Sequence, residues 1–316
     1  MIPFKRNSVL LAPMAGITDR GFRKICISYG ADGTFSEMVS AKGIYYKDKK
    51  SYKLLEYSQD EQPISLQIFG SDIESIKVAC QYINQNYSPA SIDINMGCPA
   101  PKIFQNGDGC ALMKNISLAQ KIIIAAKENS SLPISVKFRA GVDEKNINAV
   151  DFAIMCEDSG ADFITVHGRT REQFYSGCSD KEIIKKVVDS VNIPVIANGD
   201  VTDGQSAKEL LDYTRAHCVM VGRGALGNPQ IFAQIKSFIN DKPIVFEDKL
   251  SLALLHLSYT IEDKGEILAV KEFRKHLMWY LKGYKNSAKL KQLSSFVNTY
   301  DDCKKVIDLA MMQNVE

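Results

Sequence analysis

The sequence predicts an α/β fold, a (β/α)8 TIM barrel with an appended C-terminal all-α helical bundle. Short apolar runs alternate with longer amphipathic runs over the first 240 residues, and polar or reactive residues follow the apolar runs. Beyond that point only helical patterns continue. Such barrels typically need about 250 residues, so a chain of 316 residues leaves room for a small second domain. We expect a barrel domain at 1–240 and a helical domain at 241–316.

Eight runs have the continuous apolar character of buried parallel strands. In chain order they are residues 9–13, 33–38, 64–69, 91–95, 134–139, 163–168, 194–199 and 218–224. Between them lie helical patterns such as 71–83 and 117–129, the second with Ser117 as its expected N-cap. A doubly wound open sheet is the competing architecture, but eight strand–helix units favour the barrel.

The first of these runs belongs to the apolar stretch VLLAPMAGI, which follows Lys5 and Arg6. A signal peptide begins in a similar way, but Pro13 interrupts the short run and charged residues resume at Asp19. We therefore interpret the run as a buried first strand. No stretch approaches the roughly 18 uninterrupted apolar residues that a membrane span needs.

The C-terminal part predicts a small bundle of four helices. Their approximate bounds are 247–263, 266–282, 287–298 and 301–312. Apolar residues at helical spacing mark the faces expected to pack together. One stripe consists of Leu250, Leu254, Leu257 and Ile261, and another of Val270, Phe273, Leu277 and Leu281.

Composition narrows the possible partners and the compartment. Eight cysteines without a C-x-x-C pair favour free thiols in a reducing compartment, so we expect a cytoplasmic protein. The four histidines have no zinc-binding spacing, and we expect no metal. The formal net charge is only +2, so binding of a nucleic acid would depend on a local basic face. We expect a monomer.

Residues able to carry chemistry collect where the predicted strands end, which is where (β/α)8 barrels build their active sites. In strand order they are Pro13, Met14 and Ala15; Glu37; Gln67; Asn95 and Cys98; Lys137 and Arg139; His167 and Arg169; Asn198, Gly199 and Asp200; and Gly222, Arg223 and Gly224. This recurrence at every strand end is stronger evidence for a site than any single residue.

The last two strand ends, ANGD and VGRG, predict a phosphate site. Barrels commonly hold a phosphate at this position, beside a helix N-terminus. Glycine permits close backbone approach, and Arg223 can pair with the anion. The glycines would otherwise serve only tight turns, but their presence on both neighbouring strands favours the phosphate.

Two further strand residues are open to several interpretations. Lys137 lies in an otherwise apolar strand, where a buried cation is costly unless it is partnered. It could be salt-bridged or snorkelling, act as a Schiff-base nucleophile, or supply a fixed positive charge for an anion such as a reduced flavin ring. His167 alone fits a core histidine, but its neighbours Gly168 and Arg169 favour a contact with cofactor or substrate.

Cys98 opens the Gly/Pro-rich loop CPAPKIFQNGDGCALM, which is long for a βα connection and typical of an active-site lid. Free cysteines are usually small buried hydrophobic residues, and we expect this of the other seven. An unperturbed thiol has a pKa of about 8.5 and is mostly protonated near neutral pH. Cys98 is therefore available as a proton donor.

From residue 9 to about residue 235 the chain resembles the tRNA-dihydrouridine synthases, most closely their B-type bacterial branch. The resemblance rests on the motifs LAPMAGITD, LQIFG, INMGCPAPK, NGDGCALM, VKFR, VHGRT, ANGD and VGRGALGNP, which occur in the family's order. It implies an FMN enzyme that uses NADPH to reduce a uridine in the D arm of tRNA to 5,6-dihydrouridine. It also implies that the helical tail binds RNA.

The same resemblance implies a role for each strand-end residue. Cys98 would be the general acid that protonates uracil C5, opposite the face on which C6 receives a hydride. Asn95 and Arg139 would face the uracil, and Arg169 would also lie on the substrate side. The implied flavin contacts are Pro13, Met14, Ala15, Gln67, Lys137 and His167, with Asn198, Gly199, Asp200, Gly222 and Arg223 at its phosphate.

The tail contains a basic segment at 270–291, with seven Lys or Arg against one acid and a local charge of +6. A solvated helix face is the common explanation of such a run, but the low charge elsewhere favours a phosphate-binding surface. The expected tRNA contacts are Lys271, Arg274, Lys275 and Lys282, interleaved with Trp279, Tyr280 and Tyr284. The lysine run KDKKSYK at 47–53 could extend this surface.

Three other functions remain open. A flavin-dependent reductase of a free pyrimidine would need no basic tail. A Schiff-base aldolase using Lys137 would leave the Cys98 loop without a purpose. A non-catalytic RNA-binding or chaperone module would have no need of the polar strand ends.

Overall fold

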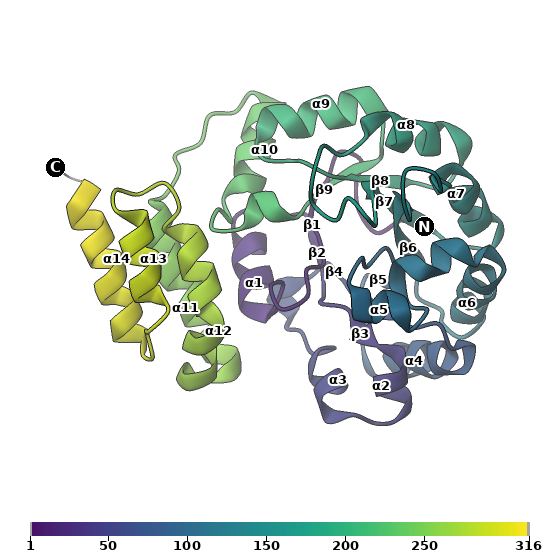
Figure 1. Cartoon of the computed structure of the whole chain (residues 1–316), viewed down its shortest axis with the longest axis horizontal. Helices are drawn as coiled ribbons and strands as arrows, with labels where there is room; N and C mark the ends of the chain where they lie inside the picture. The colour runs from purple at the N-terminus through teal and green to yellow at the C-terminus, as the bar shows by residue number, and fades with distance from the viewer. Residues whose placement is uncertain (1, 315–316) are drawn as a thin grey trace.

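The structure is a computed structural model that describes residues 2–314. Figure 1 shows a barrel ringed by helices beside a separate group of helices, with an extended segment between them. The strands are β1 (Val9–Leu11), β2 (Gly33–Phe35), β3 (Val39–Ser40), β4 (Ile64–Phe69), β5 (Ser91–Met96), β6 (Ile134–Gly141), β7 (Phe163–Thr170), β8 (Val195–Asn198) and β9 (Cys218–Val221).

The sheet closes on itself. All pairings between these strands are parallel; β1 pairs with both β9 and β2, and β2 pairs with β4, which completes the ring. The predicted barrel is therefore confirmed, and the open doubly wound sheet is wrong. Each of the eight predicted runs forms a strand. The two-residue strand β3, which pairs with the end of β4, was not predicted.

The barrel helices cover the outside of the sheet (Figure 1). They are α1 (Arg20–Ser28), α2 (Ala41–Tyr45), α3 (Lys49–Lys53), α4 (Ile73–Asn86), α5 (Pro101–Gln105), α6 (Ile116–Glu128), α7 (Ala149–Asp158), α8 (Lys181–Ser190), α9 (Gly204–Thr214) and α10 (Ile231–Asn240), with 3-10 turns η1 (Gln59–Glu61), η2 (Gly109–Lys114) and η3 (Arg223–Ala225).

The expected cap at Ser117 is wrong. The cap of α6 is Asn115, whose side chain accepts from the Leu118 N–H at 3.2 Å, because asparagine caps as well as serine and stands directly before Ile116, the first helical residue.

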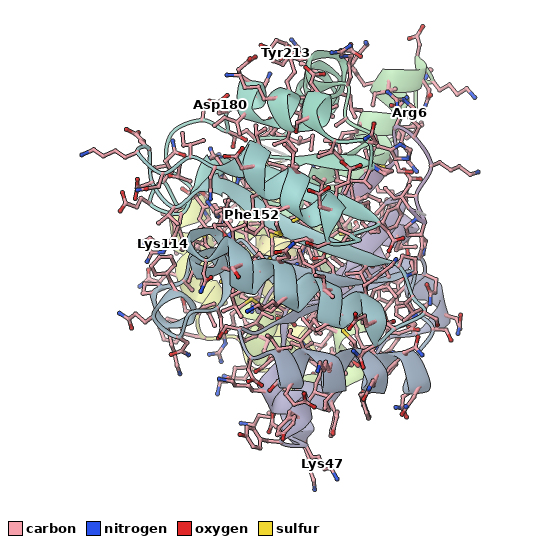
Figure 2. All side chains as sticks on the ribbon, turned by 90° about the vertical axis from the view of Figure 1, so that its right-hand side faces the viewer. Arg6, Lys47, Lys114, Phe152, Asp180 and Tyr213 are labelled. Atoms are coloured by element: carbon pink, nitrogen blue, oxygen red, sulfur yellow. The ribbon has the colours of Figure 1, made fainter. Side chains whose placement is uncertain are left out.

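Side chains fill the barrel interior, and the N-terminal segment closes one end. Phe4, Leu10, Phe35 and Phe163 are buried in one cluster, with the Phe4 ring centroid 6.1 Å from those of Phe35 and Phe163. Figure 2 shows Arg6, which precedes β1, toward the opposite end of the barrel from Lys114 and Asp180, which follow β5 and β7. The carboxyl ends of the strands are thus left as the open mouth.

Among the cysteines, six of the seven expected to be buried are buried. The prediction is wrong for Cys178, which is exposed because it lies in the surface loop after β7.

The tail forms the four expected helices. They are α11 (Lys249–Lys264), α12 (Glu266–Tyr280), α13 (Ser287–Ser294) and α14 (Tyr300–Asn314). Helix α11 packs so closely on α1 that a Cβ on Gly21 would lie 2.9 Å from the Thr260 backbone nitrogen. Ion pairs flank this contact, Lys264 with Asp19 at 2.5 Å and Arg20 with Asp263 at 2.8 Å. Over the described residues, no helix has both the length and the apolarity required to span a bilayer.

Candidate active site at the carboxyl ends of the strands

The strand register brings the predicted site residues into adjacent positions. Asn95 on β5 pairs with Lys137 on β6, Arg139 on β6 pairs with His167 on β7, and His167 in turn pairs with Asn198 on β8. Because parallel strands end at the same edge, these side chains gather at one mouth. Within residues 2–314 no three His, Cys, Asp or Glu side chains form a group suited to a metal ion.

Cys98 is held at the end of β5 by the side chain of Asn95. The Asn95 Oδ1 accepts from the backbone N–H of Gly97 at 3.1 Å and of Cys98 at 2.9 Å. The Arg139 Nε donates to the Gly97 carbonyl at 3.0 Å. The turn that carries the thiol is therefore fastened from two strands.

The segment that follows is a structured cover rather than an open loop. It contains α5 and η2, and the Cys110 N–H donates back to the Cys98 carbonyl at 3.2 Å. Gly109 has φ +59°, and a Cβ there would lie 2.9 Å from the Cys98 Cβ. Cys98 is partly buried. Burial raises the pKa of its thiol, against the lowering effects of the Ala100 N–H and Arg139, so the sulfur is protonated at neutral pH.

A buried chain of hydrogen bonds supports Asn95 from below. Its Nδ2 donates to the Gln67 Oε1 at 2.8 Å, and the Gln67 Nε2 donates to Asp93 Oδ2 at 2.7 Å. Ser135 donates to the other Asp93 oxygen at 2.6 Å. Burial raises the pKa of Asp93, although Gln67, Ser135 and Lys137 lower it. The amides of Asn95 and Gln67, predicted to touch substrate and flavin, are thus bonded to protein groups.

Sequence reasoning missed Asp93. Its signal was a lone carboxylate in the apolar run SIDIN, which a strand would not bury without partners.

Lys137 has an amide partner rather than a carboxylate. Its Nζ donates to the Asn198 Oδ1 at 2.9 Å, and Asn198 in turn donates to the Met220 carbonyl at 2.9 Å. Burial, and then the nearby Arg139, lower the pKa of Lys137 to about 8, while Asp93 opposes this. The ammonium group is therefore mostly charged at pH 7 but close to its titration range.

His167 is almost fully buried and stays neutral. Burial lowers its pKa well below the usual value, and the positive charges of Lys137, Arg139, Arg169 and Arg223 add to this effect. Arg169 approaches the His167 Nε2 at 3.5 Å. A neutral imidazole in a cationic pocket can accept or donate a hydrogen bond without adding charge.

Asp200 links two arginines across the strand ends. It pairs with Arg169 at 2.7 Å and with Arg223 at 3.2 Å, and it accepts from the Ser179 N–H at 2.7 Å. These partners lower its pKa although its partial burial raises it. Asp200 was predicted to lie at a phosphate, and that role stays a prediction. In the structure its carboxylate holds the guanidinium groups of Arg169 and Arg223.

The loop after β7 is fastened to the mouth by arginines from β6, β7 and η3. Arg139 donates to the carbonyl of Phe174 at 3.0 Å, Arg169 to that of Gly177 at 2.7 Å, and Arg223 to that of Tyr175 at 3.4 Å. The rings of Phe174 and Tyr175 remain exposed, with their centroids 4.8 Å apart. Tyr175 lies under the Arg223 guanidinium at 4.9 Å. This aromatic residue at the mouth was not among the predicted site residues.

The ends of β8 and β9 form an open glycine cradle. A Cβ on Gly199, at φ +142°, would lie 2.0 Å from the Ser179 Oγ, whereas a Cβ on Gly222 would meet nothing closer than 3.7 Å. The Ser179 Oγ is buried without a hydrogen-bond partner among the described residues. Met14 follows β1 and stands between Pro13 and Ala15 in the chain. Its sulfur is 3.8 Å from the position that a Cβ on Gly222 would occupy, so it lies beside this cradle.

The basic residues of the tail divide into two groups. Lys271 and Lys282 are exposed, and the Lys275 Nζ lies 3.7 Å from the Cβ position of Gly16, in the turn after β1. The Lys275 ammonium thus reaches the rim of the mouth. Arg274 instead donates from Nε and Nη2 to the Val297 carbonyl, at 3.0 and 2.8 Å.

Tyr280 does not interleave with the surface charges as expected. It is buried, with its hydroxyl 3.3 Å from the His256 Nδ1, because α12 directs this face toward α11 and α1.

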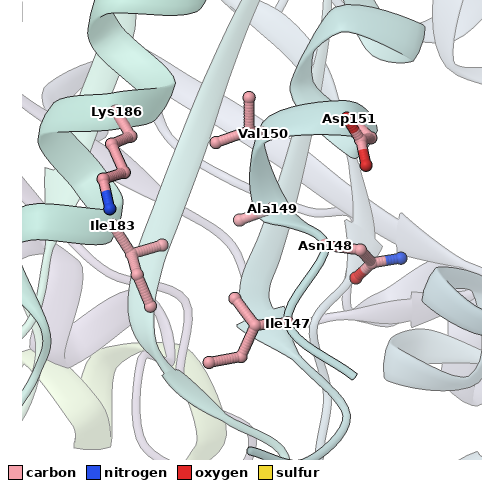
Figure 3. A pocket seen from close by; sticks show the side chains of 7 residues that line it. All are labelled: Ile147, Asn148, Ala149, Val150, Asp151, Ile183 and Lys186. Atoms are coloured by element: carbon pink, nitrogen blue, oxygen red, sulfur yellow. The ribbon is translucent and has the colours of Figure 1, made fainter. Parts of the chain in front are cut away.

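A separate hollow lies outside the mouth, between the N-terminal ends of α7 and α8 (Figure 3). Ile147, Ile183 and Lys186 are among the residues that line it, and none of the predicted site residues does. It is not part of the strand-end site.

These features define a (β/α)8 barrel with a buried cation, a glycine cradle and a neutral thiol at one mouth, the arrangement of an enzyme-type site. The comparisons with known proteins identify the family. Residues 10–316 match the family "Dihydrouridine synthase (Dus)", and the chain belongs to this family of oxidoreductases. The predicted family resemblance is confirmed.

Relatives cover most of the chain. It is 39% identical to tRNA-dihydrouridine synthase B of Pasteurella multocida, over 88% of this chain and 85% of the relative. It is 37% identical to tRNA-dihydrouridine synthase B of Vibrio vulnificus, over 98% and 94%. Among solved structures, a variant of NCR from Zymomonas mobilis shares 15% identity with a TM-score of 0.52, over 77% of this chain and 88% of that one. At that identity the likeness concerns the fold alone.

Proposed function

We propose that this protein reduces a uridine in the D arm of tRNA to 5,6-dihydrouridine, with FMN as cofactor and NADPH as reductant. Membership of the dihydrouridine synthase family supports the reaction, and relatives named tRNA-dihydrouridine synthase support the substrate. The free thiols accord with a reducing cytoplasm. The helical domain from residue 241 would contribute RNA binding to a catalytic barrel, in a chain that acts as a monomer.

The residues of the mouth fit a flavin mononucleotide. The orphaned Ser179 hydroxyl and the open space at Gly222 suit a phosphate, which Gly199 and Arg223 would also hold, with Asn198 and Asp200 fixing its surroundings. Pro13, Met14, Ala15, Gln67 and His167 would line the ring. When bound, reduced FMN would supply a hydride to uracil C6, and NADPH would restore it. The Lys137 charge would favour the anionic ring.

The position of the Cys98 thiol, partly buried at the end of β5, is the observation that carries the mechanism. Reduction of uracil leaves negative charge that must be neutralised by a proton at C5. Cys98 has that proton because burial keeps its thiol neutral, and the Asn95 side chain fixes the backbone from which the thiol projects. Cys98 would therefore be the general acid.

The substrate side of the pocket would be formed by arginines and aromatic rings. Arg139 and Arg169 would stabilise the uracil and its ribose indirectly, by holding the loop that carries Tyr175. Asn95 would contact uracil only if its bond to Gln67 opened. A uridine must leave its stack to enter the mouth, and Lys271, Lys275 and Lys282 would hold the surrounding phosphates. Arg274 would support that surface through its bonds to the α13–α14 connection.

The test begins with the purified full chain. Added FMN should bind and give flavin absorption, and NADPH should bleach it. Incubation with tRNA that lacks dihydrouridine should then give tRNA fragments heavier by two hydrogen atoms, detected by mass spectrometry. Failure to bind any flavin would overturn the proposal. Reduction of free uracil or uridine without reduction of tRNA would instead establish the free-pyrimidine activity, and a borohydride-stable adduct at Lys137 the aldolase.

A further inference from the structure

The chain between β3 and β4 builds a projecting corner with two exposed tyrosines at its tip. The rings of Tyr45 and Tyr46, at the end of α2, are 42% and 76% exposed, with centroids 5.1 Å apart at 84°. Lys47 follows in the left-handed conformation, at φ +57°. Figure 2 shows Lys47 at the lower extremity of the molecule, with its side chain directed away from the protein.

The corner is rigid, so its exposed rings are presented in a fixed arrangement. The Asp48 N–H donates to the Gly43 carbonyl at 2.8 Å, and the Tyr52 hydroxyl to the Ile44 carbonyl at 3.3 Å. A Cβ on Gly43 would lie 2.1 Å from the Ser51 Oγ, so α2 and α3 pack without a gap. A stacking surface of this kind loses little conformational entropy on binding.

The corner is also strongly basic. Residues 42–53 contain five lysines against Asp48 alone, a local charge of +4. Together with the +6 of residues 270–291 this gives +10, so the remainder of a chain of net charge +2 carries −8. The two segments therefore hold all of the excess positive charge.

The pairing of these lysines differs from that on the other side of the barrel. Lys181, Lys185 and Lys208, on α8 and α9, each pair with a carboxylate within 3.3 Å. Within the described part of the chain, none of the five lysines of the corner makes such a pair; they are Lys42, Lys47, Lys49, Lys50 and Lys53. Unpaired lysines beside exposed aromatic rings match the combination that binds the phosphates and unstacked bases of single-stranded nucleic acid.

The corner and the tail flank the same helix, α1 (Figure 1). The segment that follows α3 leads into Glu61, which pairs with Arg23 of α1 at 2.6 Å, and α11 of the tail packs on the other part of α1 at Gly21. The two basic segments are therefore joined to the barrel on either side of the same helix.

We propose that this α2–α3 corner is a second contact surface for the tRNA substrate. It takes nucleotides outside the one that is reduced: lysines hold their phosphates, and an unpaired base stacks on the more exposed ring of Tyr46, which Tyr45 supports edge-on. The inference rests on the proposed function, because the partner it names is that enzyme's substrate.

Steady-state kinetics on the full-length, flavin-loaded enzyme test the proposal. Lys47→Glu combined with Lys50→Glu should raise the KM for tRNA about ten-fold and reduce the slope of log affinity against log salt by about two. Tyr45→Ala combined with Tyr46→Ala should raise KM about ten-fold with that slope unchanged, because stacking releases no ions. The kcat and the flavin content should stay at wild-type values in both.

Matched controls come from other outer helices of the barrel. Tyr213→Ala removes an exposed tyrosine from α9, at the other end of the molecule from Lys47 in Figure 2, and Lys121→Glu reverses an exposed lysine on α6. Both should leave KM unchanged. An unchanged KM in the two corner variants, or an equal rise in the controls, overturns the corner surface. If the wild-type enzyme reduces no tRNA at all, the proposed function fails, and direct binding of tRNA to the same variants then decides the corner: an unchanged Kd in both corner variants overturns it.

Discussion

The barrel mouth and the surface of the tail use the same residue types in opposite ways. In the mouth, Lys137, Arg139 and Arg169 are buried or nearly so, and each donates to a named amide, carboxylate or carbonyl. On the tail, Lys271 and Lys282 extend into solvent. The first arrangement fixes charge where a reaction needs it, whereas the second leaves charge free to follow a flexible, solvated phosphate backbone. Loss of a mouth residue should therefore affect kcat, and loss of a tail residue KM.

The largest expected effect is that of Cys98→Ala, which should lower kcat for tRNA reduction by about 10²- to 10⁴-fold, the usual contribution of a general acid. Flavin binding and its reduction by NADPH should be unchanged, as stopped-flow absorbance would measure. Cys178→Ala removes an exposed thiol from the same rim and should turn over normally. Wild-type turnover by the Cys98 variant would remove the acid from the mechanism.

Lys137 should give the mouth its pH dependence. Because its pKa is lowered to about 8, the side chain is charged below pH 8 and neutral above, so kcat should fall as the pH rises through this range. Lys137→Arg retains its charge at every accessible pH and should lose that fall, while Lys137→Met should lower kcat about 10²-fold at pH 7. The pKa of Cys98 is raised instead. If the kcat of the Lys137→Arg variant still falls as the pH rises, ionisation of the Cys98 thiol causes the fall.

The strand ends were predictable from the sequence because parallel strands place every end at one edge. The place of Asn95, Lys137 or His167 near the end of an apolar run therefore predicts where that residue lies in the barrel as well as in the chain. Hydrogen-bond partners were not predictable in this way. The bond between Lys137 and Asn198 joins residues 61 positions apart, and the linkage of Asn95 to Asp93 through Gln67 depends on the register of three strands.

The helices of the tail were predicted but their packing was not, for a related physical reason. Amphipathic periodicity gave four helices, but it does not say which side of a helix meets which neighbour. Tyr280 therefore looked like part of the basic surface although it packs against His256. The exposed tyrosines of the α2–α3 corner lie at the end of α2, a five-residue helix that is shorter than the span that periodicity can identify.

Charge reversal on the tail should act on binding rather than on chemistry. Lys271→Glu combined with Lys282→Glu is expected to raise the KM for tRNA about ten-fold or more at moderate salt, with an effect that shrinks at high salt because the contacts are ionic. The matched variant is Arg274→Ala, which removes bonds to Val297. This variant should mainly lower the free energy of unfolding, by about 1–3 kcal/mol. A fall in kcat with unchanged KM in the lysine variant would contradict the division between the two regions.

The smallest expected effect concerns the joint between the two regions. Gly227, at φ +67°, faces α12 so closely that a Cβ would lie 2.5 Å from the Trp279 carbonyl carbon. Gly227→Ala should lower the free energy of unfolding by about 1–3 kcal/mol from overpacking, with backbone strain added, while kcat changes less than about three-fold.

Gly283→Ala separates these two causes of instability. Gly283 also has a positive φ, +96°, but a Cβ there would meet nothing within 4 Å, so its substitution introduces backbone strain without a clash. Thermal unfolding of both variants should show a larger loss for Gly227→Ala, and the difference measures the packing of α12 on the barrel. Equal losses of stability in the two variants would mean that α12 can shift to make room for the added methyl group. The tail would then be free to shift against the mouth, and the Lys275 ammonium would not be fixed beside Gly16.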